Sequence, residues 1–167
     1  MREIPLTRGY VALIDDDLYE HYAAFSWWAK VNACTVYARN KQGYMHRIIM
    51  NAPKGIEVDH IDHNGLNNQR SNLRLATRSQ NLANTKCHSD SKSAYKGIWK
   101  DKGSWTAEIA KEGRRYRLGS YATEIEAARR YDIEALKMFN EFAQTNGIST
   151  EVIPIRLPPR YRIQNGD

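Results

Sequence analysis

The stretch that decides the fold runs from Glu57 to Thr85 and reads E-V-D-H-I-D-H-N-G-L-N-N-Q-R-S-N-L-R-L-A-T-R-S-Q-N-L-A-N-T. A short apolar run ends in an acid followed directly by an imidazole, Asp59 and His60. Two asparagines, Asn72 and Asn81, come later in the same stretch. These spaced polar residues form the group whose chemistry most needs explaining.

Local signals predict the secondary structure of this stretch. Strands are expected over Ile56–His60 and Leu73–Ala76, and the polar, turn-rich residues between them predict a loop. Thr77 with Gln80 three residues later forms a capping box, which starts a helix running to about Lys86. The unit is therefore strand, long loop, strand, helix.

The residue types in this unit suit phosphodiester hydrolysis with one metal ion. That reaction needs an activated water, neutralisation of charge on the phosphate, and help for the leaving oxygen. Hard divalent cations prefer oxygen ligands, few of them from protein, which Asp59 and the Asn81 amide supply. A neutral imidazole near pH 7, such as His60, can deprotonate the water.

The spacing of these residues also bears on two other kinds of metal site. A calcium loop with Gly65 as its sixth residue would begin at His60 and end at Ser71, where carboxylates are required. A zinc site would combine His60 with His63, Cys87 and His88, but its spacing matches no common structural zinc site. Neither is favoured.

The composition describes an ordinary globular chain with a local excess of positive charge. Its 167 residues are 41% hydrophobic and 26% charged, with a net charge of +6. Residues 91–120 hold eight Lys and Arg against three Asp and Glu, interleaved with aromatics, which is typical of a polyanion binder or of a solvated basic face. Apolar runs are too short to span a bilayer, and Cys34 and Cys87 form no C-x-x-C pair. We expect an intracellular, cytoplasmic protein of a bacterial or phage-infected cell.

The N-terminal part is expected to be rich in β structure. A hairpin is predicted over 4–14 with its turn near Arg8, and Asp15 to Asp17 are expected to cap a helix from Leu18 to about Phe25. Extended structure is expected over 27–38 and, after a turn at Gln42 and Gly43, over 44–50. Six aromatics are expected in the core: Tyr22, Phe25, Trp27, Trp28, Tyr37 and Tyr44. His46 is expected at most to support residues that bind a ligand.

The basic segment predicts a small sheet with one helix. Strands are expected over 96–100, 105–111 and 114–118, with turns at Lys102-Gly103 and Glu112-Gly113. Thr123 and Glu126 are expected to cap a helix to about Ala143, whose apolar stripe packs on the sheet. One sheet face is predicted to carry Ile98, Ala107, Ile109, Tyr116 and Leu118, and the other Lys96, Lys100, Trp105, Glu108, Arg115 and Arg117.

The first group of motifs resembles a known nuclease family. Asp59-His60, Asn72 and Asn81, with N-N-Q-R-S-N-L-R between them, resemble the HNH endonucleases, in particular the H-N-N variants of phage and intron-encoded homing enzymes. The resemblance implies a ββα-metal fold and one Mg²⁺ or Mn²⁺ held by Asp59 and Asn81. It also implies that His60 is the general base and that Asn72 braces the loop and orients His60.

The second group of motifs is similar to the APETALA2/ethylene-response-factor DNA-binding domain. The similarity covers roughly 94–146 and includes the turns, strands and helix predicted above. It implies a three-stranded antiparallel sheet in the major groove of DNA with one packed helix behind. The DNA-contacting residues it implies, with neighbouring cations, are Lys96, Trp99, Lys100, Lys102, Trp105, Glu108, Arg115 and Arg117.

The sequence therefore predicts an α+β protein with two functional parts. They are an HNH module over 1–88 (a β-rich part over 1–50 and the ββα-metal motif over 51–88) and an APETALA2-like domain over 94–147, joined by a linker over 89–93 and followed by an irregular tail over 148–167. The expected function is metal-dependent nicking of double-stranded DNA by a monomer, without a membrane or an obligate protein partner. The alternative is a sequence-specific DNA-binding regulator with an inactive nuclease lobe. An RNA substrate is disfavoured because A-form RNA has a narrow major groove.

Overall fold

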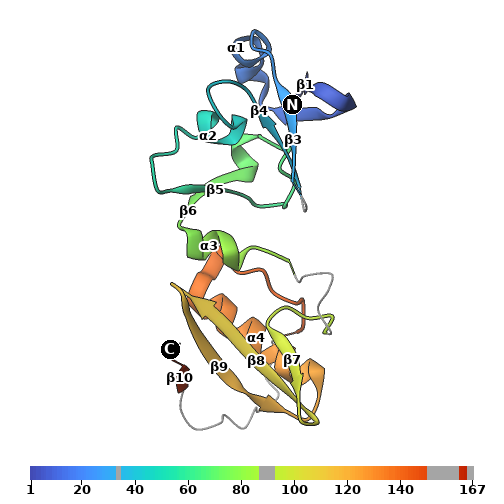
Figure 1. The fold of residues 1–167 in the computed structure, drawn as a ribbon, viewed down its shortest axis with the longest axis vertical. Helices are drawn as coiled ribbons and strands as arrows, with labels where there is room; N and C mark the ends of the chain where they lie inside the picture. The colour runs from blue at the N-terminus through green and yellow to red at the C-terminus, as the bar shows by residue number, and fades with distance from the viewer. Residues whose placement is uncertain (33–34, 87–92, 150–161, 165–167) are drawn as a thin grey trace. The chain divides into compact units, whose positions relative to one another are not determined.

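A computed structural model describes residues 1–32, 35–86, 93–149 and 162–164 (Figure 1). The chain divides into two compact units, Met1–Asn81 and Leu82–Asp167. Both are mixed α/β structures in which small antiparallel sheets are accompanied by few and mostly short helices. Within the described ranges, no helix is long and apolar enough to cross a bilayer.

The first unit opens with a two-stranded hairpin. Strands β1 (Arg2–Pro5) and β2 (Val11–Ile14) pair in an antiparallel ladder, as predicted. Its connection contains Arg8 and Gly9 with φ of 63° and 74°, so the chain reverses through two left-handed residues where the turn was expected.

The helical segment after this hairpin is shorter than predicted and begins differently. It consists of a 3₁₀ turn, η2 (Asp16–Leu18), and one helical turn, α1 (Tyr19–Ala23). The Asp15 side chain does not cap it. Its Oδ2 instead accepts hydrogen bonds from Arg70 N at 2.9 Å and Arg70 Nε at 3.0 Å. The Asp15 carboxylate, which was expected to cap the helix, therefore binds Arg70 from a distant part of the chain.

A second hairpin follows, and then a helix where extended structure was expected. Strands β3 (Trp28–Val31) and β4 (Val36–Arg39) pair in antiparallel register. The prediction of extended structure over 44–50 is wrong, because Met45–Ile49 form helix α2. Met45 is fully buried in the core, and a five-residue helix is too short to leave a periodic signal in the sequence.

The core of the first unit gathers small and aromatic side chains from these elements. It contains Ile4, Leu6, Ala12, Ile14, Tyr22, Trp27, Ala29, Ala38 and Met45. Tyr22 and Trp27 are buried, as predicted for core aromatics. Phe25 is half-buried and packs against this core, whereas Trp28 is half-buried and lies outside it, so the prediction is wrong for Trp28. Tyr37 and Tyr44 are also half-buried and lie outside this core, so the prediction is wrong for these two rings as well. They stand beside two histidines instead, as described below.

The ββα motif closes the first unit. Strand β5 (Glu57–His60) pairs with β6 (Leu73–Ala76), and α3 (Arg78–Ala83) follows, close to the predicted positions (Figure 1). The capping box is present, since Thr77 N donates to Gln80 Oε1 at 2.8 Å and Gln80 N to Thr77 Oγ1 at 3.3 Å. The helix ends at Ala83, three residues earlier than expected.

The second unit is built on an antiparallel sheet. Strands β7 (Ile98–Asp101), β8 (Ser104–Lys111) and β9 (Arg114–Tyr121) form a meander with turns at the two predicted sites. A further strand, β10 (Arg162–Gln164), pairs with β9. The prediction that the tail forms no regular structure is therefore wrong at these three residues. The exposed edge of β9 offers backbone groups that a short extended segment can pair with.

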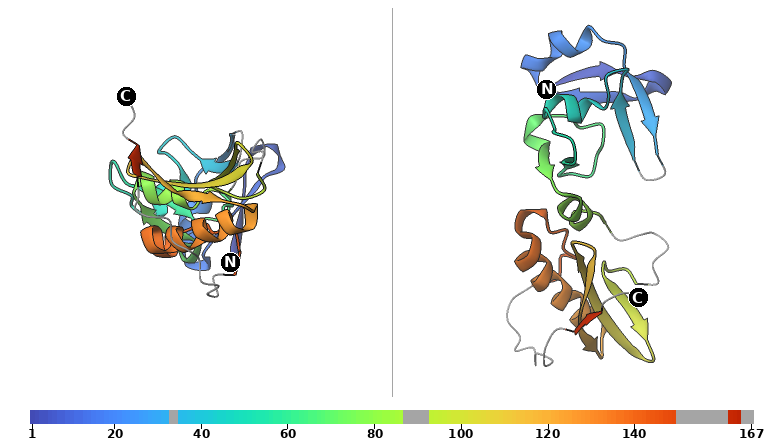
Figure 2. Two further views of the ribbon diagram at one scale, coloured as in Figure 1. Left: turned by 90° about the horizontal axis from the view of Figure 1, so that it is seen from below. Right: turned by 60° about the vertical axis from the view of Figure 1, so that its left-hand side comes forward.

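One helix covers one face of this sheet. Helix α4 (Glu124–Phe139) lies across β7–β9 (Figure 2) and continues into a 3₁₀ turn, η4 (Asn140–Phe142). The predicted capping box of Thr123 and Glu126 is present. Helix and sheet bury a common apolar layer, which includes Ile98, Ala107, Ile109, Leu118, Ala127, Ala128, Tyr131, Ala135 and Phe139.

Candidate active site

His60 is the last residue of β5 and is buried, with 7% of its surface exposed. It follows Asp59, which is also buried, at 4%. Neighbouring residues in a strand point to opposite faces, so different neighbours bury the two side chains: Arg74 contacts Asp59, and the ring of His46 contacts His60. Burying two adjacent ionisable side chains costs free energy, so the end of β5 is a candidate functional position.

Aromatic and imidazole rings pack against His60. The ring of His46, from α2, meets it edge to face with centroids 4.9 Å apart. Tyr37, from β4, lies 5.8 Å from His60 and 5.3 Å from His46. The ring of Tyr44 stacks on that of His46, with centroids 5.5 Å apart. The neighbouring hairpin and helix therefore supply the environment of the predicted base.

The electrostatics of the two histidines follow from this burial. Burial lowers the pKa of His60, while Asn68 and the carboxylates of Asp62 and Asp59 act in the opposite direction. Burial also lowers the pKa of His46 to about 3, with further contributions from His60 and Arg47. Both imidazoles are consequently neutral near pH 7.

Asp59 is held by a cation from the paired strand. Arg74 stands opposite Asp59 in the β5–β6 register and donates to Asp59 Oδ2, from Nε at 2.8 Å and from Nη2 at 2.7 Å. Both side chains are largely shielded from water. The pairing fixes the carboxylate through one of its two oxygens.

Asn81 contacts a carboxylate, Glu57, that is not among the predicted site residues. Asn81 Nδ2 donates to Glu57 Oε2 at 2.6 Å, so the amide oxygen is directed away from Glu57. Glu57 lies two residues before Asp59, and therefore on the same face of β5. That alternation was the available signal for including Glu57 in the site.

The donor set fits one hard cation with few protein ligands. Within the described ranges, no group of three or more His, Cys, Asp or Glu side chains could hold a metal ion. Mg²⁺ needs no such cluster, since one or two carboxylates with phosphate and water suffice. Asp59 offers a carboxylate and Asn81 an orientable amide oxygen. Of the zinc ligands considered above, Cys87 and His88 lie outside the described residues.

Asn72 ties together the loop between β5 and β6. Its Nδ2 donates to Asp62 Oδ1 and to Asn67 O, both at 2.9 Å, and its Oδ1 accepts from Asp62 N at 3.1 Å. Its backbone carbonyl accepts from Ile61 N, directly after His60, at 2.9 Å. Burial alone would raise the pKa of Asp62, but hydrogen bonds led by that from Asn64 lower it overall.

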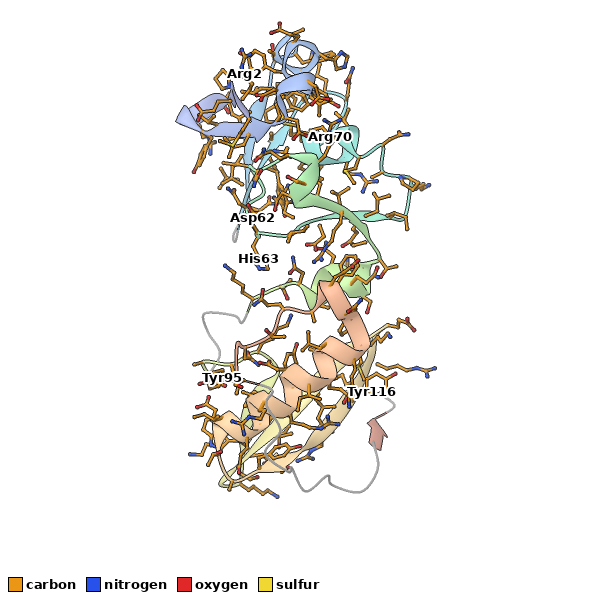
Figure 3. All side chains as sticks on the ribbon, turned by 180° about the vertical axis from the view of Figure 1, so that it is seen from behind. Arg2, Asp62, His63, Arg70, Tyr95 and Tyr116 are labelled. Atoms are coloured by element: carbon orange, nitrogen blue, oxygen red, sulfur yellow. The ribbon has the colours of Figure 1, made fainter. Side chains whose placement is uncertain are left out.

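The rest of the first unit supports this loop at both ends. Figure 3 shows Asp62 and His63 at one end and Arg70 at the other. Arg70 binds Asp17, with Nη2 2.6 Å from Oδ1, as well as Asp15. A Cβ atom on Gly65 would lie 2.5 Å from the Val36 carbonyl oxygen and 2.6 Å from the Tyr37 ring, so glycine permits this close approach.

The second unit presents a polar sheet face away from α4. Arg117 Nη2 donates to Thr106 Oγ1 at 3.2 Å and to Ser120 Oγ at 3.1 Å, and its guanidinium lies 5.8 Å from the Trp99 ring. Arg115 pairs with Glu108 at 3.3 Å on the same face. We call this set, Trp99, Glu108, Arg115 and Arg117, the outer face.

The remaining predicted DNA contacts lie elsewhere. Lys100 stands opposite Trp105, and the register puts both on the side of Ala107, so their predicted placement beside Arg117 is wrong. A register irregularity between Ala107 and Glu108 underlies the difference from a regular meander. Lys102 lies exposed at the β7–β8 turn, with φ of 44°.

Lys96 precedes the sheet and is engaged at the end of a helix. Its Nζ donates to the carbonyls of Ala83 at 2.5 Å, Thr85 at 2.6 Å and Leu82 at 3.3 Å. A cation at carbonyls of the final helical turn stabilises that end of the helix. Lys96 therefore has a role within the protein that the sequence did not indicate.

Comparison with known proteins places these features in a family. Residues 44–83 match the model of the HNH endonuclease family. The chain is 33% identical over 147 residues to an uncharacterized HNH endonuclease of Acanthamoeba polyphaga mimivirus, covering 84% of this chain and 77% of the relative. It is 39% identical over 70 residues to Protein 3.8 of Escherichia phage T7, covering 41% of this chain and 58% of that protein. No solved structure matches significantly.

Proposed function

The chain belongs to the HNH endonuclease family and is a nuclease, and we propose that it cleaves double-stranded DNA with a divalent metal ion and His60 as general base. The observation that carries this proposal is the ending of β5, where a buried imidazole of lowered pKa follows a buried carboxylate. A base that is neutral near pH 7 can accept a proton from the attacking water. The nearby carboxylates of Asp59 and Asp62 favour the imidazolium that results.

Asp59 and Asn81 would hold the metal ion, Mg²⁺ or Mn²⁺. When bound, the ion neutralises charge on the phosphate and on the leaving oxygen. The protein's part is to hold the ligands ready. Arg74 fixes Asp59, and Glu57 accepts from Asn81, which leaves the amide oxygen to serve as a ligand. Asn72 would keep the following loop, and with it the end of β5, in position.

We propose that residues 94–147, within the second unit, form an APETALA2-like DNA-binding domain. A three-stranded meander backed by one helix, with arginines, a tryptophan and a glutamate on its outer face, supports this assignment. Arg115 and Arg117 are suited to contact guanine or phosphate. Lys102 extends from the turn of the same sheet. Because Lys96 is engaged with carbonyls, we leave it out of this contact set.

The expected product is a nick. A single ββα site engages one strand at a time, so a monomer would cut one strand per binding event. A homing enzyme or a free-standing phage nuclease is the natural setting for such an activity. The alternative, a DNA-binding regulator with an inactive nuclease lobe, would keep the outer face but lose the reaction.

Plasmid cleavage tests the proposal. Supercoiled DNA carrying the gene's own neighbourhood is incubated with the full chain and Mg²⁺, Mn²⁺ or EDTA, beside the His60→Ala variant. We expect open circles only with metal and intact His60. Tight DNA binding without cleavage in any metal would favour the regulator, and linear product at the earliest times would contradict nicking.

A further inference from the structure

Helix α2 contacts β5 at both of its ends. Arg47 Nη1 donates to the carbonyl of Ile56, just before the strand, at 2.6 Å, and Arg47 Nη2 donates to the carbonyls of Ala52 and Pro53, each at 3.1 Å. One residue earlier on the helix, His46 meets the ring of His60 at the strand's other end. A single helical turn thus holds the strand that carries the proposed base.

His46 and His60 contact each other through their rings. Their ring planes are 82° apart with centroids at 4.9 Å, an edge-to-face arrangement that specifies ring orientation as well as separation. Tyr44 stacks on His46 with planes 15° apart, and Tyr37 touches both histidines. A His60 ring that rotated about its χ angles would lose these contacts.

We propose that His46 is a positioning residue for the reaction, a rigid ring from α2 that fixes the orientation of the His60 imidazole. This inference rests on the proposed role of His60 as general base. A base must be aligned with the proton it accepts, and small misplacements of such groups cost large factors in rate. The ββα motif alone supplies no ring at this position, because the ring comes from the helix ahead of it.

Two features of His46 favour a role for its ring over a role for Nδ1 or for a charged imidazolium. Its Nδ1 is buried without a hydrogen-bond partner within the part of the chain that the structure describes. Its pKa, lowered to about 3 mainly by burial, keeps the imidazole neutral at any pH suited to cleavage. His46 therefore does not compete with His60 for the proton near pH 7.

The test compares two apolar replacements of similar bulk. His46→Leu fills the space without a flat ring, whereas His46→Phe restores a flat ring, and both remove the nitrogens. Single-turnover cleavage by the full chain and DNA affinity in EDTA are measured for each. Met45→Leu, a substitution at the neighbouring core position, is the control for disturbance of α2.

We expect His46→Leu to slow single-turnover cleavage roughly 10- to 100-fold with the DNA dissociation constant changed less than about twofold. His46→Phe and Met45→Leu should stay within about fivefold of the wild-type rate. NMR signals of the His60 ring should shift or broaden in His46→Leu and change less in His46→Phe.

Equal rates for His46→Leu and His46→Phe would overturn the inference, as would a loss of DNA affinity that accounts for the loss of rate. His60→Ala is run alongside. If His60→Ala still cleaves, the proposed function has failed. If His60→Ala is inactive while His46→Leu cleaves at the wild-type rate, only the role of His46 has failed.

Discussion

The proposed catalytic site and the outer face expose their charged side chains to different degrees. In the first unit, the acid and base of the proposed site are buried, with Asp59 and His60 at 4% and 7% exposure. In the second unit, the outer face is open: Trp99 is 42% exposed, and the Arg115 side chain 73%. Chemistry requires groups whose position and pKa are set by their surroundings, whereas contact with DNA requires groups that water can reach.

The cations show the same contrast. Around the proposed base, arginines bind groups of the protein itself: Arg74 binds Asp59, and Arg47 binds three backbone carbonyls. Of the outer-face arginines, Arg115 makes an exposed ion pair, and such pairs contribute little to stability and are readily exchanged for phosphate or base contacts. We therefore expect catalysis and affinity to be separable by mutation.

Among the substitutions that leave His46 and His60 unchanged, Asn81→Ala should have the largest effect, and this effect should be on the metal requirement of cleavage and not on DNA binding. Loss of the amide oxygen removes a proposed metal ligand, so we expect the Mg²⁺ concentration for half-maximal cleavage to rise by at least about tenfold, with DNA affinity in EDTA unchanged. Arg78→Ala is the matched control. It removes the exposed neighbour that also contacts Glu57, at 3.5 Å, and should leave the metal requirement within about twofold. An unchanged requirement in Asn81→Ala would remove Asn81 from the ligand set.

Arg117→Ala should act on the other unit. If Arg117 reads a base, specific binding should weaken by about 1–3 kcal/mol while binding to unrelated DNA changes little. Arg114→Ala removes the same charge from the same strand, but the register turns position 114 to the other face, so it should cost less. Competition binding assays with target and random duplexes measure both. A uniform loss across sequences would assign Arg117 to phosphate.

A smaller effect concerns pH and the first unit alone. Burial holds the pKa of folded His46 at about 3, below the 6.5 of an unfolded histidine, so its neutral form stabilises the fold above pH 6.5 and this stability is lost as pH falls toward 3. Between pH 7 and 5, we expect wild type to lose about 2 kcal/mol more unfolding free energy than His46→Phe. Urea titrations followed by NMR signals of Ala12 and Ala38 measure it. Equal losses would mean that His46 is not buried as a neutral ring.

Most of the secondary structure could be predicted from short sequence motifs. The capping boxes at Thr77 and Thr123 and the turns at Lys102-Gly103 and Glu112-Gly113 depend on residues within a few positions of each other, and all are present. Helix α2 was missed because its five residues are held by packing of Met45 in the core. Packing between distant segments leaves little trace in a short window.

The same distinction between local and long-range information applies to the candidate site. Asp59, His60 and Asn81 stand out by type and spacing, but their partners do not. The strand register places Arg74 opposite Asp59, and strand alternation places Glu57 on the same face as Asp59, so both neighbours follow from the hairpin. The hydrogen bond between Glu57 and Asn81 joins β5 to α3 and does not follow from the hairpin. The approach of His46 to His60 joins residues from a helix and a strand, and nothing local predicts it.

The most direct test of separable catalysis and affinity is the DNA binding of His60→Ala, measured with its cleavage rate on the same substrate. Removing a dedicated base should reduce cleavage by at least about a thousandfold while the dissociation constant in EDTA stays within a few-fold of wild type. A comparable loss of binding would mean that the first unit supplies affinity as well, and surviving cleavage would mean that His60 is not the base.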